Sequence, residues 1–282
     1  MSLGITAAVL DLPWPFEREY MQLALAAGLV VGACAPLIGV FLVQQRMALL
    51  GDGIGHLAFA GVAAGLLLEV WPVWSALVVA AVGALVIQLL RRRGTTTGDL
   101  ALALMFYGGI ALGVVLISRA GTGSVNVLPY LFGSILTVEP GDVRVVVVLG
   151  VVIVVSILVL GRVLLASVLD EETARVAGLP VDLASSTLAV LTAVTVVAAM
   201  RVVGVLLVAA LMVLPVASSR LLARSFRTTV LLAVVVGIAS VVIGLVAARQ
   251  WALAPGGSIV LAATACFAIT AAVRGRGRRV GV

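Results

Sequence analysis

Apolar stretches of membrane-spanning length recur along this chain and constrain its fold more than any other feature. A helix needs roughly 20 predominantly apolar residues to cross the hydrocarbon core of a bilayer. The candidate spans are residues 22–43, 48–68, 73–90, 99–118, 143–162, 181–199, 202–219, 228–248 and 257–273. We therefore predict an all-α, polytopic transmembrane helical bundle with about nine spans, forming a single domain over residues 1–282.

The composition excludes an ordinary soluble domain, because 63% of the residues are hydrophobic and only 11% are charged. Soluble domains are nearer half apolar and a quarter charged. The formal net charge of +6 depends on arginine alone, since the chain contains no lysine. In a soluble protein this excess would suggest a nucleic-acid partner. In a membrane protein, the enrichment of arginine in cytoplasmic loops explains it, and we expect the lipid bilayer rather than nucleic acid as the partner.

Residues 127–138, VLPYLFGSILTV, are apolar but too short to cross a membrane. Pro129, Gly133 and Ser134 interrupt the segment. Half-length or irregular backbone is tolerated at membrane depth only where protein or a water-filled cavity surrounds it. The segment therefore predicts one short re-entrant helix in addition to the spans.

Nine spans would place the two ends of the chain on opposite sides of the membrane, and arginine indicates which end is inside. With the C-terminus inside, the cytoplasmic arginines are Arg46, Arg91, Arg92, Arg93, Arg162, Arg175, Arg220, Arg224, Arg227, Arg274, Arg276, Arg278 and Arg279. Those outside are Arg18, Arg119, Arg144, Arg201 and Arg249. This bias follows the positive-inside rule. It predicts an external N-terminal segment (residues 1–21) and a basic cytoplasmic tail (residues 274–282).

The stretch LLGDGIGHLAFAGV, residues 49–62, places Asp52 and the only histidine, His56, inside the second span. A spacing of four residues puts both side chains on one helix face. Counted from Arg46 at the cytoplasmic interface, Asp52 lies about 9 Å and His56 about 15 Å along the helix, near the middle of a core of roughly 30 Å. Carboxylate and imidazole suit Zn²⁺ or Mn²⁺. The pair is a candidate transit site for a metal ion.

The pair alone leaves a second interpretation open. An intramembrane aspartate costs about 2.5–3.5 kcal/mol on insertion scales and normally faces a cavity or a partner. Two donors do not close a tetrahedral shell, which suits a site that the ion leaves again. In the structural alternative, Asp52 lies at the wet end of its helix and His56 bonds to a neighbouring backbone group. Cys34 and Cys266 lie in apolar runs and are interpreted as packing residues rather than a disulfide, with a role as soft metal ligands left open.

Residues 163–180 form a predicted cytoplasmic hairpin that contains the acidic sequence DEET. Asp170 can cap a short helix, and the acidic residues after it are favoured by the helix dipole. Gly178 ends the helix. Two helical turns are more than a connector needs, so the hairpin is a candidate docking element for a cytoplasmic partner, with a solvated loop helix as the alternative. Its proposed coupling residues are Asp170, Glu171, Glu172, Arg175 and Gly178.

The sequence contains no energy source for transport. A phosphate-binding loop requires a lysine, and the chain has none. No chain of intramembrane carboxylates of the proton-relay kind is present, and neither GxSxG nor HExxH occurs. We therefore expect no enzyme activity in this chain. Concentrative transport would draw on ATP hydrolysis by a separate subunit.

Five segments occur in an order that matches a known family. They are LLGDGIGHLAFAGVAAG, PYLFGSILTVEPGDV, DEETARVAGLPV, VVGVLLVAALMVLPVASSRLLARSF and APGGSIVLAATACF. Together they resemble the permease subunit of the bacterial zinc, manganese and chelated-iron ABC importers, a branch of the vitamin-B12-type importers. Each segment is only moderately specific, whereas five in order form a strong signal over most of residues 22–273. The YLFG stretch is closest to the high-affinity zinc uptake permeases.

The resemblance implies a vitamin-B12-importer-like permease fold in the bacterial plasma membrane. It implies a permease homodimer that works with a cytoplasmic ABC ATPase dimer and an external metal-binding lipoprotein or periplasmic protein. The transported substrate would be a divalent transition metal ion, Zn²⁺ first and Mn²⁺ second, with no tightly bound cofactor.

The resemblance also implies roles for individual residues. Asp52 and His56 would line the metal path, and residues 170–181 would form the coupling helix that docks into the ATPase. The residues bordering the pore and the re-entrant segment would be Tyr130, Phe132, Gly133, Ser134 and Pro215. The chain departs from the family pattern at Gly53 and Gly55, where alanine and serine are common. This departure removes the basis for a hydroxyl contribution beside the pair.

Alternatives from other classes stay open at this point. A stand-alone divalent cation channel or secondary transporter would work without an ATPase. A siderophore or cobalamin importer permease would need a wide path lined by aromatic residues, which make up only 5% of this chain. An intramembrane hydrolase has the least support, because the one histidine is already paired with Asp52.

Overall fold

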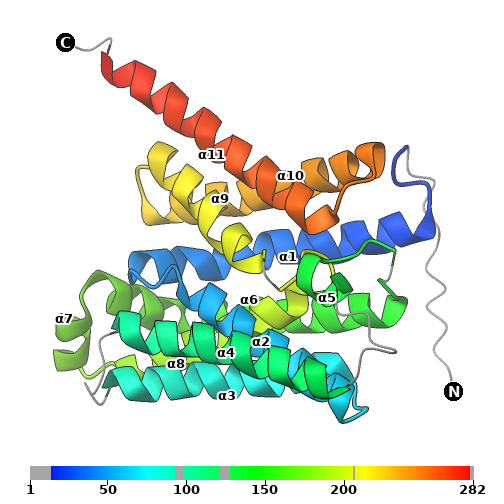
Figure 1. The fold of residues 1–282 in the computed structure, drawn as a ribbon. Coiled ribbons are helices and arrows are strands. Elements are labelled where there is room, and N and C mark those ends of the chain that lie inside the picture. Colours follow the sequence, from blue (N-terminus) through cyan, green and yellow to red (C-terminus); the bar gives the residue numbers. More distant parts are fainter. Residues whose placement is uncertain (1–13, 93–97, 121–127, 137, 206, 280–282) are drawn as a thin grey trace, which may run out of the picture.

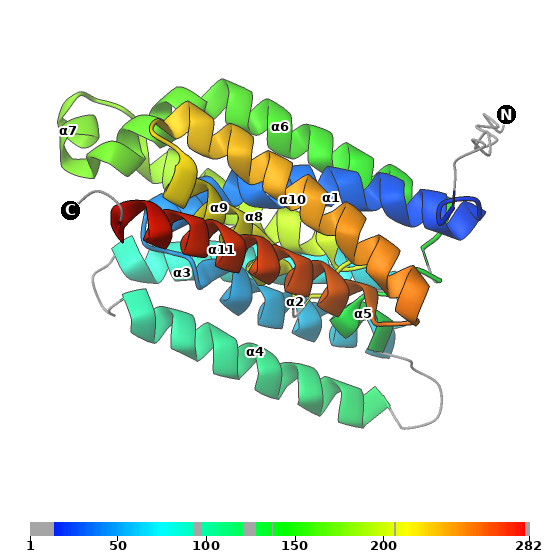
Figure 2. The same cartoon turned by 90° about the horizontal axis from the view of Figure 1, so that it is seen from above.

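The computed structural model describes residues 14–92, 98–120, 128–136, 138–205 and 207–279. All regular secondary structure in these ranges is α-helical. The helices are α1 (Glu19–Gln44), α2 (Leu50–Leu67), α3 (Pro72–Arg92), α4 (Gly98–Ala120), α5 (Leu128–Phe132), α6 (Pro140–Leu169), α7 (Glu171–Val176), α8 (Val181–Ala199), α9 (Val208–Leu222), α10 (Phe226–Trp251) and α11 (Pro255–Arg279). The long helices run side by side in one elongated bundle, which confirms the predicted fold class (Figure 1, Figure 2).

Eight helices of the described chain are long and apolar enough to cross a membrane, and they overlap eight of the predicted spans. The remaining span, predicted at 202–219, is the 15-residue helix α9, which begins only at Val208. Residues 200–203 form a turn instead of the start of a helix. The backbone around this turn bonds to the re-entrant segment, and this interaction lies outside the reach of any local sequence pattern.

The two described ends of the chain lie at opposite ends of the bundle. Figure 1 shows the start of α1 at one end, and α7 with the C-terminal end of α11 at the other. A chain that crosses the membrane an odd number of times has its two ends on opposite sides, and this arrangement agrees with that. Most of the predicted tail at 274–282 is not a separate segment, because α11 continues to Arg279. Of the N-terminal segment 1–21, residues 1–13 lie outside the described chain, and α1 already begins at Glu19.

Burial divides the helices into a centre and a periphery. Among the membrane-length helices, α1, α2 and α8 are the most buried, whereas α4, α6 and α11 are the least buried. The peripheral helices expose leucine and valine side chains such as Leu104, Val148 and Leu158. Apolar surface of this kind is suited to lipid or to another apolar protein surface. Helix α2, with the Asp–His pair, therefore lies in the interior of the bundle, packed against α3, α4, α8 and α9.

Candidate functional site

Asp52 and His56 lie one turn apart on α2. The Nε2 atom of His56 is 3.9 Å from Oδ1 of Asp52. His56 is only 8% exposed, whereas the side chain of Asp52 is 34% exposed. The structure therefore brings the two predicted metal donors together, as a buried imidazole beside a partly accessible carboxylate.

Helix α2, which holds the pair, begins later in the sequence than we assumed when predicting the depth of the pair in the membrane. Residues 45–49 are not helical, Arg46 adopts a φ of +58°, and α2 starts at Leu50. His56 thus lies six residues, or about 9 Å, into the helix, and counting its depth along a helix from Arg46 was an error. The error arose because residues of a turn were counted as helix.

A cavity of about 240 Å³ adjoins Asp52 at the interface between α2 and α4. Its lining residues are Leu49, Asp52, Gly53, Leu102, Ala103, Phe106 and Tyr107. Asp52 is the one charged residue among them. In a cavity with an otherwise largely apolar lining, this carboxylate is the group that can attract a cation.

Packing rather than hydrogen bonding holds the His56 ring. The Phe106 ring lies edge-on to it, with centroids 4.1 Å apart. Helix α4 approaches so closely that a Cβ on Gly109 would lie 2.8 Å from the carbonyl carbon of His56. The buried Nδ1 of His56 has no hydrogen-bond partner within the described chain. Nε2, the nitrogen that faces Asp52, is the one positioned to bind a ligand.

The spacing of the pair fits one divalent ion. Zinc bonds to imidazole nitrogen and carboxylate oxygen are about 2.0–2.2 Å long, so one ion can touch two atoms up to about 4.2 Å apart. The observed 3.9 Å lies within that limit, and a small side-chain rotation would bring the two atoms to the separation of about 3.4 Å that tetrahedral coordination requires. No group of three histidine, cysteine or acidic side chains that could hold an ion occurs in the residues described. Cys34 and Cys266 are free thiols and belong to no such group.

The re-entrant segment is short, as predicted, and its backbone is bonded to the turn that follows α8. Tyr130 and Phe132 lie on the five-residue helix α5. The carbonyl of Tyr130 accepts a hydrogen bond from Val205 N (2.9 Å), and Ser134 N donates to the carbonyl of Arg201 (3.3 Å). Gly133 has a φ of +74°, and a Cβ there would collide with the backbone of the 200–205 turn. The segment thus packs against this turn on one side, while Leu128, Phe132 and Leu136 are exposed.

An ion pair that the sequence analysis missed fastens this turn to α6. Arg201 Nη2 lies 2.7 Å from Oδ2 of Asp142, and Asp142 is only 5% exposed. The Arg201 guanidinium also lies 5.3 Å from the centre of the Tyr130 ring. Arg201 was predicted to lie in an external loop, yet it is largely enclosed by protein. The two residues are 59 positions apart, and no spacing rule links them.

The predicted docking hairpin contains α7, a six-residue helix at the same end of the bundle as the end of α11 (Figure 1). Asp170 caps it: Thr173 donates from its hydroxyl (2.6 Å) and from its backbone N–H (3.0 Å) to the carboxylate. These two hydrogen bonds, the hydroxyl one first, lower the pKa of Asp170 below its usual value. Gly178 has a φ of +75°, which favours glycine where the chain turns back towards α8.

The remaining predicted residues lie at separate places. Glu171 and Arg175 form an exposed ion pair on α7 (3.0 Å), and Glu172 is exposed beside them. Pro215 is buried within α9. The structure thus brings together Asp52 with His56, and Glu171 with Arg175, but it keeps the Asp–His pair and the α7 hairpin on different elements.

An all-helical bundle of membrane-length helices, with a buried imidazole beside a partly accessible carboxylate on a central helix, is the arrangement expected of a membrane protein with an intramembrane functional site. Comparison with known proteins gives the family. The family model of the ABC 3 transport family matches residues 17–274, and the chain belongs to this family. It is therefore a membrane permease of the ABC type.

Several curated relatives match nearly the whole chain. The manganese transport system membrane protein MntC of Halalkalibacterium halodurans is 33% identical over 89% of this chain and 86% of its own length. The high-affinity zinc uptake system membrane protein ZnuB of Haemophilus influenzae is 30% identical over 89% of this chain and 97% of its own. The manganese import system permease protein ScaB of Streptococcus gordonii is 29% identical over 90% and 91%.

Solved structures show the same fold. PsaBC from Streptococcus pneumoniae, in complex with Fab, superposes with a TM-score of 0.81 at 31% identity, covering 90% of this chain and 91% of that one. An inward-facing, putative metal-chelate type ABC transporter superposes with a TM-score of 0.70 at 17% identity, covering 95% and 90%. The second likeness supports the predicted permease fold alone.

Proposed function

We propose that this chain is the membrane-spanning permease of an ATP-driven importer for a divalent transition metal ion, with Asp52 and His56 as transient ligands. The observation that carries the proposal is the buried imidazole 3.9 Å from a carboxylate at the edge of a cavity. An ion that enters the bundle loses hydration, and two protein donors offset part of that loss. Two donors also hold the ion weakly enough for it to leave.

The proposed substrates are Zn²⁺ first and Mn²⁺ second. Imidazole suits zinc, and carboxylate suits manganese, so the Asp–His pair accepts both ions. The relatives named above include a zinc uptake protein and manganese transport proteins. Uptake measured separately for the two metals decides between them.

The proposed assembly is a homodimer of permeases in the bacterial plasma membrane. Helix α7 would dock into a cytoplasmic ABC ATPase dimer through Asp170, Glu171, Glu172, Arg175 and Gly178. Its capped end and its exposed position support this assignment. An external metal-binding lipoprotein or periplasmic protein would deliver the ion at the opposite end, with the N-terminus outside and the C-terminus inside.

The proposed route on the external side passes the re-entrant segment. Tyr130, Phe132, Gly133 and Ser134 lie against the 200–205 turn, and a Cβ on Gly55, next to His56, would lie 3.0 Å from the Val205 carbonyl oxygen. The turn therefore reaches from the re-entrant segment to the helix that holds the metal pair. Pro215 would border the same route from α9.

The test measures uptake of radioactive zinc and manganese by cells that lack their own copy of the gene and carry a plasmid variant. Asp52→Asn removes the charge and keeps the shape, and His56→Ala removes the imidazole. Both variants should abolish uptake at an unchanged membrane level. Glu17→Gln, which makes the same chemical change at an exposed position, is the control.

Normal uptake by both site variants would show that the pair is not the metal site. Uptake by wild-type vesicles that continues after ATP depletion would identify a stand-alone channel or secondary transporter instead of an ABC importer.

A further inference from the structure

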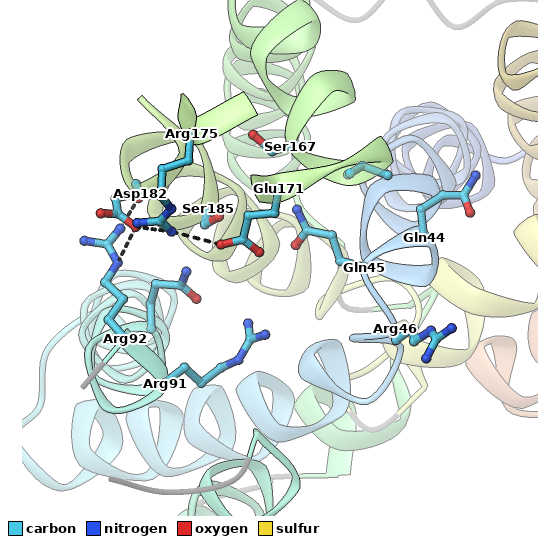
Figure 3. Close-up of a pocket in the computed structure, with 12 residues that line it drawn as sticks. Gln44, Gln45, Arg46, Arg91, Arg92, Ser167, Glu171, Arg175, Asp182 and Ser185 are labelled. Atoms are coloured by element: carbon cyan, nitrogen blue, oxygen red, sulfur yellow. Dashed lines mark hydrogen bonds and ion pairs between the residues drawn. The ribbon is translucent and has the colours of Figure 1, made fainter. Parts of the chain in front are cut away.

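One carboxylate joins the end of α3 to the short helix α7. Oδ1 of Asp182, the second residue of α8, lies 3.6 Å from Nε of Arg92 and 3.4 Å from Nη2 of Arg175. Figure 3 shows Asp182 between these two guanidinium groups, with Glu171 on the far side of Arg175. The acid belongs to α8, while its two basic partners come from α3 and α7. A single side chain thus bridges three elements.

Helix α7 has few other attachments to the bundle. Ala174 is the one residue of α7 that is buried. The helix packs mainly against α6 and α8, its neighbours along the chain. A cavity of about 450 Å³ lies between the α7 hairpin and the ends of α1 and α3, with Arg91 and Glu171 in its lining (Figure 3). This space separates α7 from α3, and the ion pairs of Asp182 connect the two helices across it, from α8, which itself packs against α3.

Nearer its start and in its middle, α3 packs closely against the helix that holds the metal pair. A Cβ on Gly61 of α2 would lie 2.6 Å from the Cα of Ala76 on α3. A Cβ on Gly83 of α3 would collide with the side chain of Leu57, the residue after His56. Helices that pack backbone to backbone with no voids between them transmit strain and move together. A displacement of α3 therefore displaces the segment of α2 that holds Asp52 and His56.

We infer that Asp182 is a positioning residue that transmits movement of the coupling helix α7 to the α2–α3 pair, and so to the metal donors. This inference rests on the proposed function, in which α7 receives the movement of the ATPase. Arg92 strengthens the α3 end of the link, because it also donates to the Ser186 hydroxyl (2.6 Å) and to the carbonyl of Asp182. The residues are partly exposed, and exposed ion pairs contribute little to stability. Their loss should alter coupling and leave the fold intact.

The test uses the complete transporter, permease with its ATPase, in liposomes, and measures metal ions transported per ATP hydrolysed. Asp182→Asn should leave assembly and basal ATP hydrolysis unchanged and lower this ratio at least about 5-fold, the lower end of ordinary coupling between sites. Asp182→Glu, which keeps the charge, should restore most of the ratio. Glu69→Gln, at an exposed carboxylate far from α7 in the sequence, is the matched control.

A second variant keeps the test decisive. Arg92→Gln breaks only the α3 end of the link and leaves every residue of α7 unchanged, so it should lower the ratio by a similar factor with the ATPase still bound. A wild-type ratio in both variants overturns the inference. Loss of ATPase binding by Asp182→Asn also overturns it, because Asp182 would then be a docking residue. A wild-type complex that transports no metal instead overturns the proposed function.

Discussion

The ion pair of Asp142 and Arg201 joins distant parts of the described chain. It fastens the start of α6 to the turn after α8, and both partners are largely enclosed by protein. Removing one partner of a buried pair leaves the other charge without compensation, whereas removing both does not. The pair therefore concerns the folding of this end of the bundle.

Arg201→Met should lower stability strongly, by about 3–5 kcal/mol, because Asp142 would stay buried and charged. The double variant Asp142→Leu with Arg201→Met should be markedly more stable than the single one. Thermal unfolding of the purified protein, followed by circular dichroism, measures both effects. Equal melting temperatures for the single and double variants would contradict the assignment.

At the scale of single elements, α7 depends on Asp170, the capping residue just before it. The carboxylate of Asp170 accepts two hydrogen bonds from Thr173, and these bonds lower its pKa. A carboxyl whose folded pKa is lowered stabilises the folded state above its unfolded pKa, and this contribution is lost as the pH falls through the folded value. At neutral pH the cap is therefore fully formed.

Asp170→Ala should loosen α7 and reduce the amount of ATPase that co-purifies with the permease. Asp170→Asn should retain most of it, because asparagine is also a good helix cap. The two variants remove the same charge, so co-purification that falls equally in both would assign Asp170 a charge contact with the ATPase instead of a capping role.

Helix boundaries were predictable from the sequence only where local patterns decide them. The spans from α3 to α8 follow from apolar length, and the α7 cap follows from the DEET sequence. The late start of α9 was not predictable, because residues 202–207 are as apolar as the helix that follows. The turn at residues 200–205 is held by hydrogen bonds to Tyr130 and Ser134, about seventy residues earlier, which no local pattern records.

For the whole molecule, the sequence alone placed Asp52 and His56 on one helix face, and the structure places that face against α4 and a cavity. The contacts between helices, around the pair and at α7, could not be predicted in this way. Phe106 contacts the His56 ring from another helix, and Asp182 joins α3 to α7. Apolar periodicity assigns helices, but it does not specify which helices become neighbours.

The orientation of the chain is a prediction for the whole molecule. Thirteen arginines on one side and five on the other favour a cytoplasmic C-terminus under the positive-inside rule. A green fluorescent protein fused after Val282 should therefore fluoresce, and alkaline phosphatase fused there should be inactive. Fusions in the 69–71 turn should give the opposite pattern. The same pattern at both positions would require a different number of crossings.

The proposed two-donor site on α2 would have a consequence for the speed and selectivity of transport. An ion held by one imidazole and one carboxylate lies in a shallow free-energy well, so its residence is brief and its release does not limit turnover. A shallow well also discriminates poorly among first-row ions, whose affinities for such donors follow a common order. In the proposed importer, the choice of metal is therefore made largely before the ion enters the membrane, by the protein that captures it outside.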